Sequence, residues 1–114
     1  MLARKYTLSD KKTFERIEKE GKVFQSESFG LGIYKREDGG PSRFGFVVST
    51  KISKEAVQRN RIKRALSEAV RFEMSYIKPG YDVVFLAKGI SARKPTDELM
   101  GEVRMALEKA GLSK

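Results

Sequence analysis

Apolar residues recur with the period of an α-helix in the middle of the chain. From Glu55 onward, positions three and four apart carry apolar side chains that form one continuous stripe. The stripe consists of Ile62, Ala65, Leu66 and Ala69, and the opposite side consists of Asn60, Arg64, Ser67 and Arg71, with Arg59, Arg61 and Lys63 on its flanks. The pattern predicts an amphipathic helix that reaches about residue 77, with Ser53 as its N-cap and Pro79-Gly80 after its end.

Two further helices are predicted nearer the ends of the chain. Ser9 is the expected N-cap of a helix over 10–20, whose apolar side carries Phe14 and Ile17 and which Gly21 ends. Thr96 is the expected cap of a last helix that ends at Gly111. The buried stripe of that helix consists of Leu99, Val103, Ala106, Leu107 and Ala110.

The remaining apolar residues follow strand patterns. Residues 22–36 form one extended segment with alternating apolar positions, and residues 81–87 are almost entirely apolar. Residues 43–50 carry apolar side chains on both faces, which predicts a strand near the centre of the sheet. The segment Glu37-Asp38-Gly39-Gly40-Pro41 is typical of a hairpin turn between the first two strands.

These elements predict a fold of the α/β class. Because a long helix separates 43–50 from 81–87, these two strands are expected to be parallel. We expect an α/β two-layer sandwich with the element order αββαβα and one small mixed sheet, formed by a single domain over residues 1–114. The default hand of the crossover is right-handed.

Composition narrows the chemistry that this fold can support. The chain has no cysteine and no histidine, which excludes disulfides, zinc sites with thiolate or imidazole ligands, and Ser–His or Cys–His catalysis. Its aspartates occur singly, without the pairing of a general acid and base. No apolar run has the length of a membrane span, and the first residues lack the apolar core of a signal peptide. We therefore expect a soluble cytoplasmic protein with no membrane partner.

The net charge of +9 indicates a polyanionic partner. Much of this charge lies between residues 51 and 64, which contain six lysines and arginines and one glutamate. A solvated helix face usually mixes signs, because like charges one turn apart repel each other. Lys51 and Lys54 add cations at the start of the helix, where backbone N–H groups also favour a phosphate. The alternative is a basic surface that only increases solubility.

The order of residues within this basic stretch is specific. Arg59-Asn60-Arg61-Ile62-Lys63-Arg64, preceded by Ala56-Val57, resembles the RNR motif of the protein subunit of bacterial ribonuclease P. The resemblance covers most of the chain. It includes a first helix that carries Phe14 and ends at Gly21, and the strands at 43–49 and 81–87.

The resemblance implies a ribosomal-protein-like sandwich whose βαβ crossover is left-handed. It also implies a protein that joins the catalytic RNA of ribonuclease P and binds the 5′ leader of precursor tRNA, which the complex removes by endonucleolytic cleavage. In this family the RNA carries the phosphodiester hydrolysis with bound Mg²⁺. The protein itself is then expected to have no catalytic residue, no metal ligand and no cofactor of its own.

Two sets of residues are expected to contact RNA. The set for the catalytic RNA consists of Lys51, Lys54, Arg59, Asn60, Arg61, Lys63, Arg64 and Arg71. The set for the groove that receives the leader of precursor tRNA consists of Phe14, Tyr34, Arg59, Asn60 and Lys63. For Phe14 the alternative is packing in the core, because an aromatic residue on a helix serves either purpose.

The chain departs from the family pattern at a few positions. Family members often carry a second aromatic residue one turn after the first, where this chain has Glu18. Gly32 stands where the second strand often offers an aromatic residue, and Tyr34 on the same face is a candidate to replace it. Thr50 replaces the lysine that usually precedes Lys51.

Two other classes of protein share this composition. One is a non-enzymatic RNA-binding protein of the ribosomal or chaperone-like type, which only the RNR motif and its context separate from a ribonuclease P subunit. The other is a DNA-binding regulator. No helix-turn-helix spacing surrounds the basic helix, so we expect no DNA partner.

Overall fold

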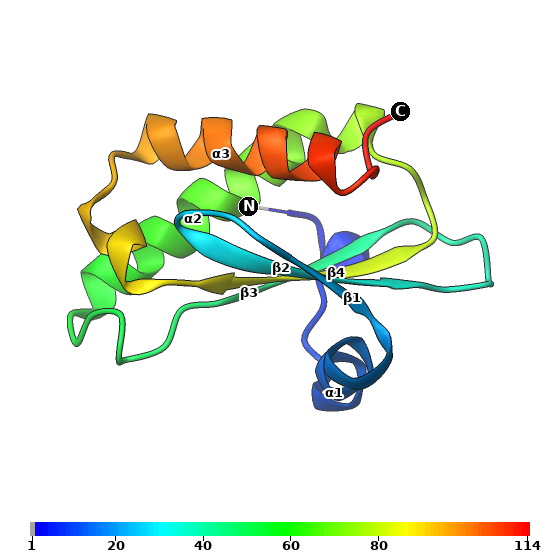
Figure 1. The fold of residues 1–114 in the computed structure, drawn as a ribbon, viewed down its shortest axis with the longest axis horizontal. Coiled ribbons are helices and arrows are strands. Elements are labelled where there is room, and N and C mark those ends of the chain that lie inside the picture. Colours follow the sequence, from blue (N-terminus) through cyan, green and yellow to red (C-terminus); the bar gives the residue numbers. More distant parts are fainter. Residues whose placement is uncertain (1) are drawn as a thin grey trace.

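The computed structural model describes residues 2–114 as a four-stranded sheet with helices on both faces (Figure 1). The helices are α1 (Lys11–Glu20), α2 (Ala56–Glu73) and α3 (Thr96–Lys109), and the strands are β1 (Lys22–Gln25), β2 (Phe29–Lys35), β3 (Arg43–Val47) and β4 (Tyr81–Ala87). Short 3-10 helices cover Arg4–Tyr6, Met74–Tyr76 and Gly89–Arg93. Helices α2 and α3 pack on one face of the sheet and α1 packs on the other. The predicted α/β class and its small mixed sheet are confirmed.

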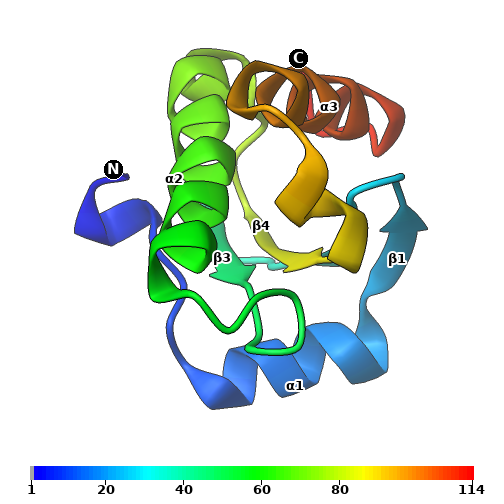
Figure 2. The ribbon, with the colours of Figure 1, turned by 90° about the vertical axis from the view of Figure 1, so that its left-hand side faces the viewer.

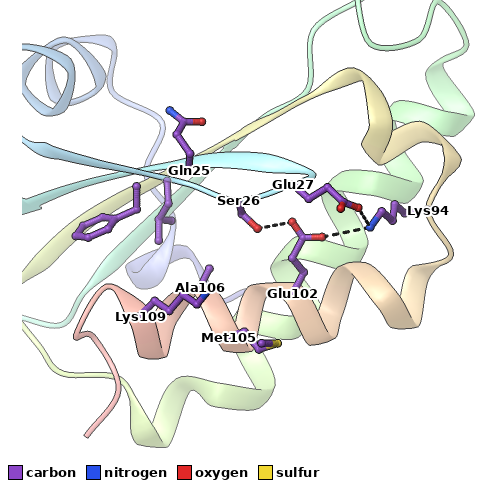
Figure 3. A pocket seen from close by; sticks show the side chains of 10 residues that line it. Gln25, Ser26, Glu27, Lys94, Glu102, Met105, Ala106 and Lys109 are labelled. Carbon is purple, nitrogen blue, oxygen red and sulfur yellow. Dashed lines mark hydrogen bonds and ion pairs between the residues drawn. The ribbon is translucent and has the colours of Figure 1, made fainter.

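The segment predicted as one strand over 22–36 is two strands. β1 pairs antiparallel with β2, so the element order is αβββαβα. The turn between them, Ser26-Glu27-Ser28, contains no glycine, proline, asparagine or aspartate and is held by Glu102 of α3. The Glu102 carboxylate accepts hydrogen bonds from the Ser28 N–H (2.7 Å) and the Ser28 hydroxyl (2.7 Å). It also accepts one from the Ser26 hydroxyl (Figure 3). Because Glu102 is distant in sequence, local patterns do not reveal this turn.

The turn over 37–41 does not close a hairpin between neighbouring strands. β4 lies between β2 and β3, antiparallel to β2 and parallel to β3, in the order β1-β2-β4-β3. The predicted parallel pair is therefore confirmed, but the prediction of a hairpin is wrong. Asp82 of β4 supplies a physical reason, because its fully buried carboxylate pairs with Arg36 before the turn (2.5 Å) and with Arg43 after it (2.9 Å).

β3 is an edge strand, which corrects the prediction that it lies at the centre of the sheet. The N-terminal segment covers its outer edge, where the Leu8 N–H donates to the Phe44 carbonyl (2.8 Å) and Thr7 forms a parallel bridge to Phe44. Helices on both sides of the sheet account for the apolar residues on both faces of β3. The strand ends at Val47, three residues before the predicted end.

The crossover from β3 through α2 to β4 is left-handed. In Figure 2 both strands run toward the viewer, α2 lies above the sheet, and β4 lies to the right of β3. The chain therefore winds against the right-handed default. The hand implied by the family resemblance is confirmed.

Helices α1 and α2 begin differently from the prediction. Asp10, not Ser9, caps α1, and its carboxylate accepts the Lys12 N–H (3.1 Å). The Ser53 hydroxyl accepts a hydrogen bond from the Glu55 N–H (3.2 Å). Because Glu55 precedes the first helical residue of α2, Ser53 orders the connection and does not cap the helix. The last turn before residue 77 is a 3-10 helix instead of a continuation of α2.

The ends of α3 lie close to the predicted ones. Thr96 is its first helical residue and follows Pro95 at the cap position. Gly111 ends the helix with a φ of 76°, a left-handed conformation that favours glycine. Within the predicted stripe, Leu99, Val103 and Leu107 are fully buried.

The core has two parts that the sheet separates. The larger part fills the space between the sheet and the two helices α2 and α3, and it includes Ile62, Leu66 and Ala69 of the predicted stripe. Ala65, the fourth residue of that stripe, is buried as well. The smaller part lies under α1 and contains Leu8, Ile17 and Val84. Ser67, predicted on the outer side of α2, is buried. Within residues 2–114, no helix combines the length and apolarity needed to cross a membrane.

Candidate nucleic-acid interface

The first half of α2 and the connection before it present exposed cations. The cationic surface, as we name it, consists of Lys51, Lys54, Lys63 and Arg64, with exposed Asn60 among them. Within residues 2–114, no carboxylate forms an ion pair with these side chains. The charge of this surface is therefore available to a polyanion, as the sequence predicts.

Arg59 and Arg61 are half-buried and bind oxygen atoms of the protein itself. Arg59 donates to the Ser53 carbonyl (2.9 Å). Arg61 donates to the Gln58 side chain (2.9 Å) and to the carbonyls of Lys94 (3.1 Å) and Ala92 (3.3 Å). The geometry gives Arg61 a structural role, because its guanidinium joins α2 to the segment that precedes α3. Because carbonyl oxygens carry no net charge, these hydrogen bonds do not neutralise the positive charge of either arginine.

Arg71 lies further along α2 and differs from the cations of the cationic surface. Its guanidinium pairs with the Glu68 carboxylate (2.7 Å) and lies 4.9 Å from the centre of the Phe72 ring. The hydrogen bond from Arg71 lowers the pKa of Glu68 to about 2 and raises the pKa of Arg71 itself. Because the pair is neutral, Arg71 is poorly suited to the phosphate contact predicted for it.

A cavity of about 310 Å³ opens on the opposite face of the sheet, beside α1. We call it the α1 cavity. It is lined by Phe14, Ile17, Glu18, Val23, Gly32, Val47, Val84 and Leu86. The three residues at its open side are exposed to 56% (Val23), 38% (Val47) and 46% (Leu86), so apolar surface faces solvent here. An aromatic and aliphatic hollow on a basic protein suits an unpaired base.

Two glycines shape the α1 cavity by letting α1 approach the sheet. A Cβ atom on Gly45 would lie 2.6 Å from Cε1 of Phe14, and one on Gly32 would lie 2.8 Å from Cγ2 of Ile17. Both distances are too short for real atoms, so any larger residue would push α1 away. The lack of a side chain at Gly32 therefore leaves room for α1, which explains why position 32 carries no aromatic residue.

Of the residues predicted for the leader groove, the structure brings only Phe14 to the α1 cavity. Tyr34 shares the same face of the sheet but lies outside the lining, and the guanidinium of Arg16 lies 5.5 Å from the centre of its ring. Arg59, Asn60 and Lys63 belong to α2, on the other face of the sheet. The lining residues Glu18, Val23, Val47 and Leu86 were missed, although strand alternation places Val47 and Leu86 on the face opposite the core.

A second hollow, of about 460 Å³, lies between β1 and α3 near the β1–β2 turn (Figure 3). Three of its four charged groups already serve the fold, because Glu102 binds the turn and Lys94 pairs with Glu27 and lies 3.9 Å from Glu102. The larger volume therefore does not make it the better candidate. The α1 cavity has apolar walls and a Glu18 carboxylate without a bonded partner in residues 2–114.

Comparison with known proteins decides among the classes left open by this geometry. The family model described as Ribonuclease P matches residues 2–111. The chain belongs to the ribonuclease P protein family. It is 34% identical to the ribonuclease P protein component of Symbiobacterium thermophilum over 94% of this chain and 92% of the relative. It is 36% identical to that of Clostridium kluyveri, over 96% and 97% of the two chains.

A solved structure agrees with this assignment. The ribonuclease P protein of Staphylococcus aureus superposes with a TM-score of 0.89, at 26% identity, over 96% of this chain and 98% of that chain. As a ribonuclease P protein component, the chain acts in tRNA processing within a ribonuclease complex that includes RNA.

Proposed function

We propose that this ribonuclease P protein binds the catalytic RNA through the cationic surface and holds the 5′ leader of precursor tRNA in the α1 cavity. The complex then removes the leader by endonucleolytic cleavage. One observation carries the proposal: cations without carboxylate partners and an exposed apolar cavity occur together in a member of this family. Phosphate groups of the RNA provide the negative charge that pairs with these cations, and an unpaired base provides a flat surface that packs in the apolar cavity.

The hydrolytic step is assigned to the RNA, with Mg²⁺ as the ion that supports it. Within residues 2–114, no group of three or more acidic side chains gathers as a metal site would require. The fully buried carboxylate of Asp82 is committed to Arg36 and Arg43, so it is not free to act as a base. The contribution of the protein is then binding, through phosphate neutralisation on one face and base stacking on the other.

The leader is the natural occupant of the α1 cavity because it is single-stranded. Stacking of one base on an aromatic ring contributes about 1–3 kcal/mol and needs no pairing partner. The Phe14 ring is partly exposed in the lining, with Gly45 behind it. Mature tRNA has no leader and therefore gains nothing from this contact.

Reconstitution tests the proposal directly. The purified protein is mixed with a bacterial ribonuclease P RNA at a Mg²⁺ concentration where the RNA alone cleaves precursor tRNA poorly. We expect cleavage to be restored and precursor tRNA to bind more tightly than mature tRNA. Binding of RNA without any gain in cleavage would overturn the proposal and favour the non-enzymatic RNA-binding alternative.

A further inference from the structure

Glu18 is the one ionisable side chain in the lining of the α1 cavity. The other lining residues are Phe14, aliphatic residues and Gly32. Glu18 and Phe14 are four residues apart on α1, so the carboxylate and the ring lie on the same side of the helix, one turn apart. The cavity therefore combines a stacking surface with one group able to form directed hydrogen bonds.

The Glu18 carboxylate is free to bind a ligand. It is exposed, and no hydrogen bond or ion pair engages it within residues 2–114. Asp38, Glu68 and Glu102, by contrast, all have partners in the fold. An ionised carboxylate only accepts hydrogen bonds, so it attracts N–H groups and repels carbonyl and phosphate oxygens.

We propose that Glu18 makes the α1 cavity select guanine from the leader of precursor tRNA. This inference rests on the proposed function, because the leader must first occupy the cavity. The volume of about 310 Å³ is large enough for a base. A base that stacks on Phe14 can place its Watson–Crick edge against the neighbouring Glu18, and this edge is one of the two by which proteins read unpaired bases.

The four bases differ in what this edge offers to a carboxylate. Guanine presents two adjacent donors, N1–H and N2–H, which match the two carboxylate oxygens in a bidentate contact. Adenine and cytosine each present an amino donor beside a ring nitrogen that repels the carboxylate. Uracil presents one N–H between two carbonyl oxygens. The expected order of affinity is guanine first, adenine and cytosine next, and uracil last.

A set of precursor tRNAs tests the selection. Each precursor has a leader of uridines with one guanosine, which is moved along successive leader positions. We measure the affinity of each precursor for the reconstituted complex at fixed salt. We expect about tenfold tighter binding when the guanosine is at the position that reaches the cavity, as for other bidentate base contacts. Replacing that guanosine by adenosine or cytidine should lower the affinity, and replacing it by uridine should lower the affinity most.

Variants of α1 separate base selection from a general charge effect. Glu18→Gln keeps the size of the side chain but replaces one acceptor by a donor, so the guanine preference should disappear. Glu20→Gln removes the same charge from the same helix at an exposed position outside the lining, and it should retain the preference. A guanine preference that survives in Glu18→Gln, or is lost equally in Glu20→Gln, would overturn the assignment of Glu18.

The outcomes also separate this inference from the proposed function. Equal affinities for all guanosine positions, together with restored cleavage and tighter binding of precursor than of mature tRNA, would overturn the base selection alone. Failure to restore cleavage would overturn the proposed function, and the inference with it. Circular dichroism of each variant confirms that the comparison is made between folded proteins.

Discussion

At the scale of single residues, the cations in and after the RNR motif have different surroundings. Arg61 is bound to carbonyl oxygens before α3, whereas Lys63 is exposed and has no carboxylate partner in residues 2–114. The motif alone predicts the same phosphate contact for both residues. The structure separates them, because neighbouring residues on a helix point about 100° apart and only some face solvent.

We predict that Arg61→Ala lowers stability more than it lowers the electrostatic part of RNA binding. The loss of hydrogen bonds from a charged group to partly buried carbonyls should destabilise the protein by about 1–3 kcal/mol. Urea unfolding measures this loss, and the dependence of RNA affinity on salt concentration measures phosphate contacts.

Lys63→Ala is the matched comparison for Arg61→Ala. It should leave the stability nearly unchanged and reduce the slope of log affinity against log salt by about one. If Arg61→Ala reduces this slope as much as Lys63→Ala while the protein keeps its full stability, Arg61 contacts phosphate and its structural role is wrong.

At the scale of elements, the β1–β2 turn depends on a carboxylate from α3. Burial raises the pKa of Glu102, but hydrogen bonds from Ser26 and Ser28 and the charge of Lys94 more than offset this, so the pKa lies below its usual 4.5. A carboxyl group whose pKa is lower in the folded state stabilises the protein above its unfolded pKa. This stabilisation is lost as the pH falls through the folded pKa.

We predict that Glu102→Gln flattens the acid dependence of stability. At about pH 7 the variant should be less stable than the wild type by about 1–3 kcal/mol, because hydrogen bonds to a charged acceptor are lost. The difference should shrink as the pH falls from about 4.5 through the lower pKa of the folded protein, where the wild-type carboxylate becomes protonated. Urea unfolding at several pH values measures both curves. Glu108→Gln, at an exposed position of the same helix, is the control, and a constant difference across the pH range would contradict the prediction.

The elements also show what a sequence can and cannot predict. The helical stripes and the β4 strand were predictable because each depends on periodicity within a few turns or one strand. The reversal between β1 and β2 was not, because Glu102 comes from another part of the chain. The position of β4 between β2 and β3 was not predictable either, because the ion pairs of Asp82 with Arg36 and Arg43 join segments that are distant in sequence.

The same distinction applies to the candidate site. The exposed cations near the RNR motif follow from the helical pattern alone. The α1 cavity brings together residues from α1, β1, β2, β3 and β4. Of these, the sequence predicted only Phe14 as a contact, although the family resemblance marked the positions of Glu18 and Gly32. Tyr34 lies on the same face of the sheet as the α1 cavity but outside its lining, beside Arg16. Strand alternation predicts the face, but the position of α1 across the sheet decides which residue of that face lines the cavity.

At the scale of the whole molecule, the sheet separates α2 from the α1 cavity. Helix α2, which carries Lys63 and Arg64, lies above the sheet in Figure 1, whereas the α1 cavity lies below it and the connection from β3 to α2 reaches down toward α1 (Figure 2). Packed strands lie between α2 and the cavity, and no side chain belongs to both of the proposed binding surfaces. We therefore expect the two surfaces to make separate contributions to binding.

We predict that Phe14→Ala and Lys63→Ala weaken different binding steps. Phe14→Ala should weaken the binding of precursor tRNA about tenfold through lost stacking and leave mature tRNA unaffected. Lys63→Ala should weaken assembly with the catalytic RNA. Their free-energy effects on precursor binding should add to within about 0.5 kcal/mol in the double variant.

Phe14→Leu is the control for packing, since it retains an apolar side chain against Gly45 but offers no ring to a base. An equal loss of affinity for precursor and mature tRNA in Phe14→Ala would return Phe14 to a purely structural role. Strong non-additivity in the double variant would mean that one RNA segment touches both surfaces.

The cover on the outer edge of β3 has a practical consequence for handling this protein. The Leu8 N–H binds the Phe44 carbonyl, which an uncovered edge strand would leave free to pair with a strand of another molecule. Trimming the polypeptide ahead of Ser9 would uncover a template for strand addition, next to the apolar side chain of Val47. We therefore expect Thr7 and Leu8 to protect this edge from self-association, and affinity tags to be better attached to the other terminus.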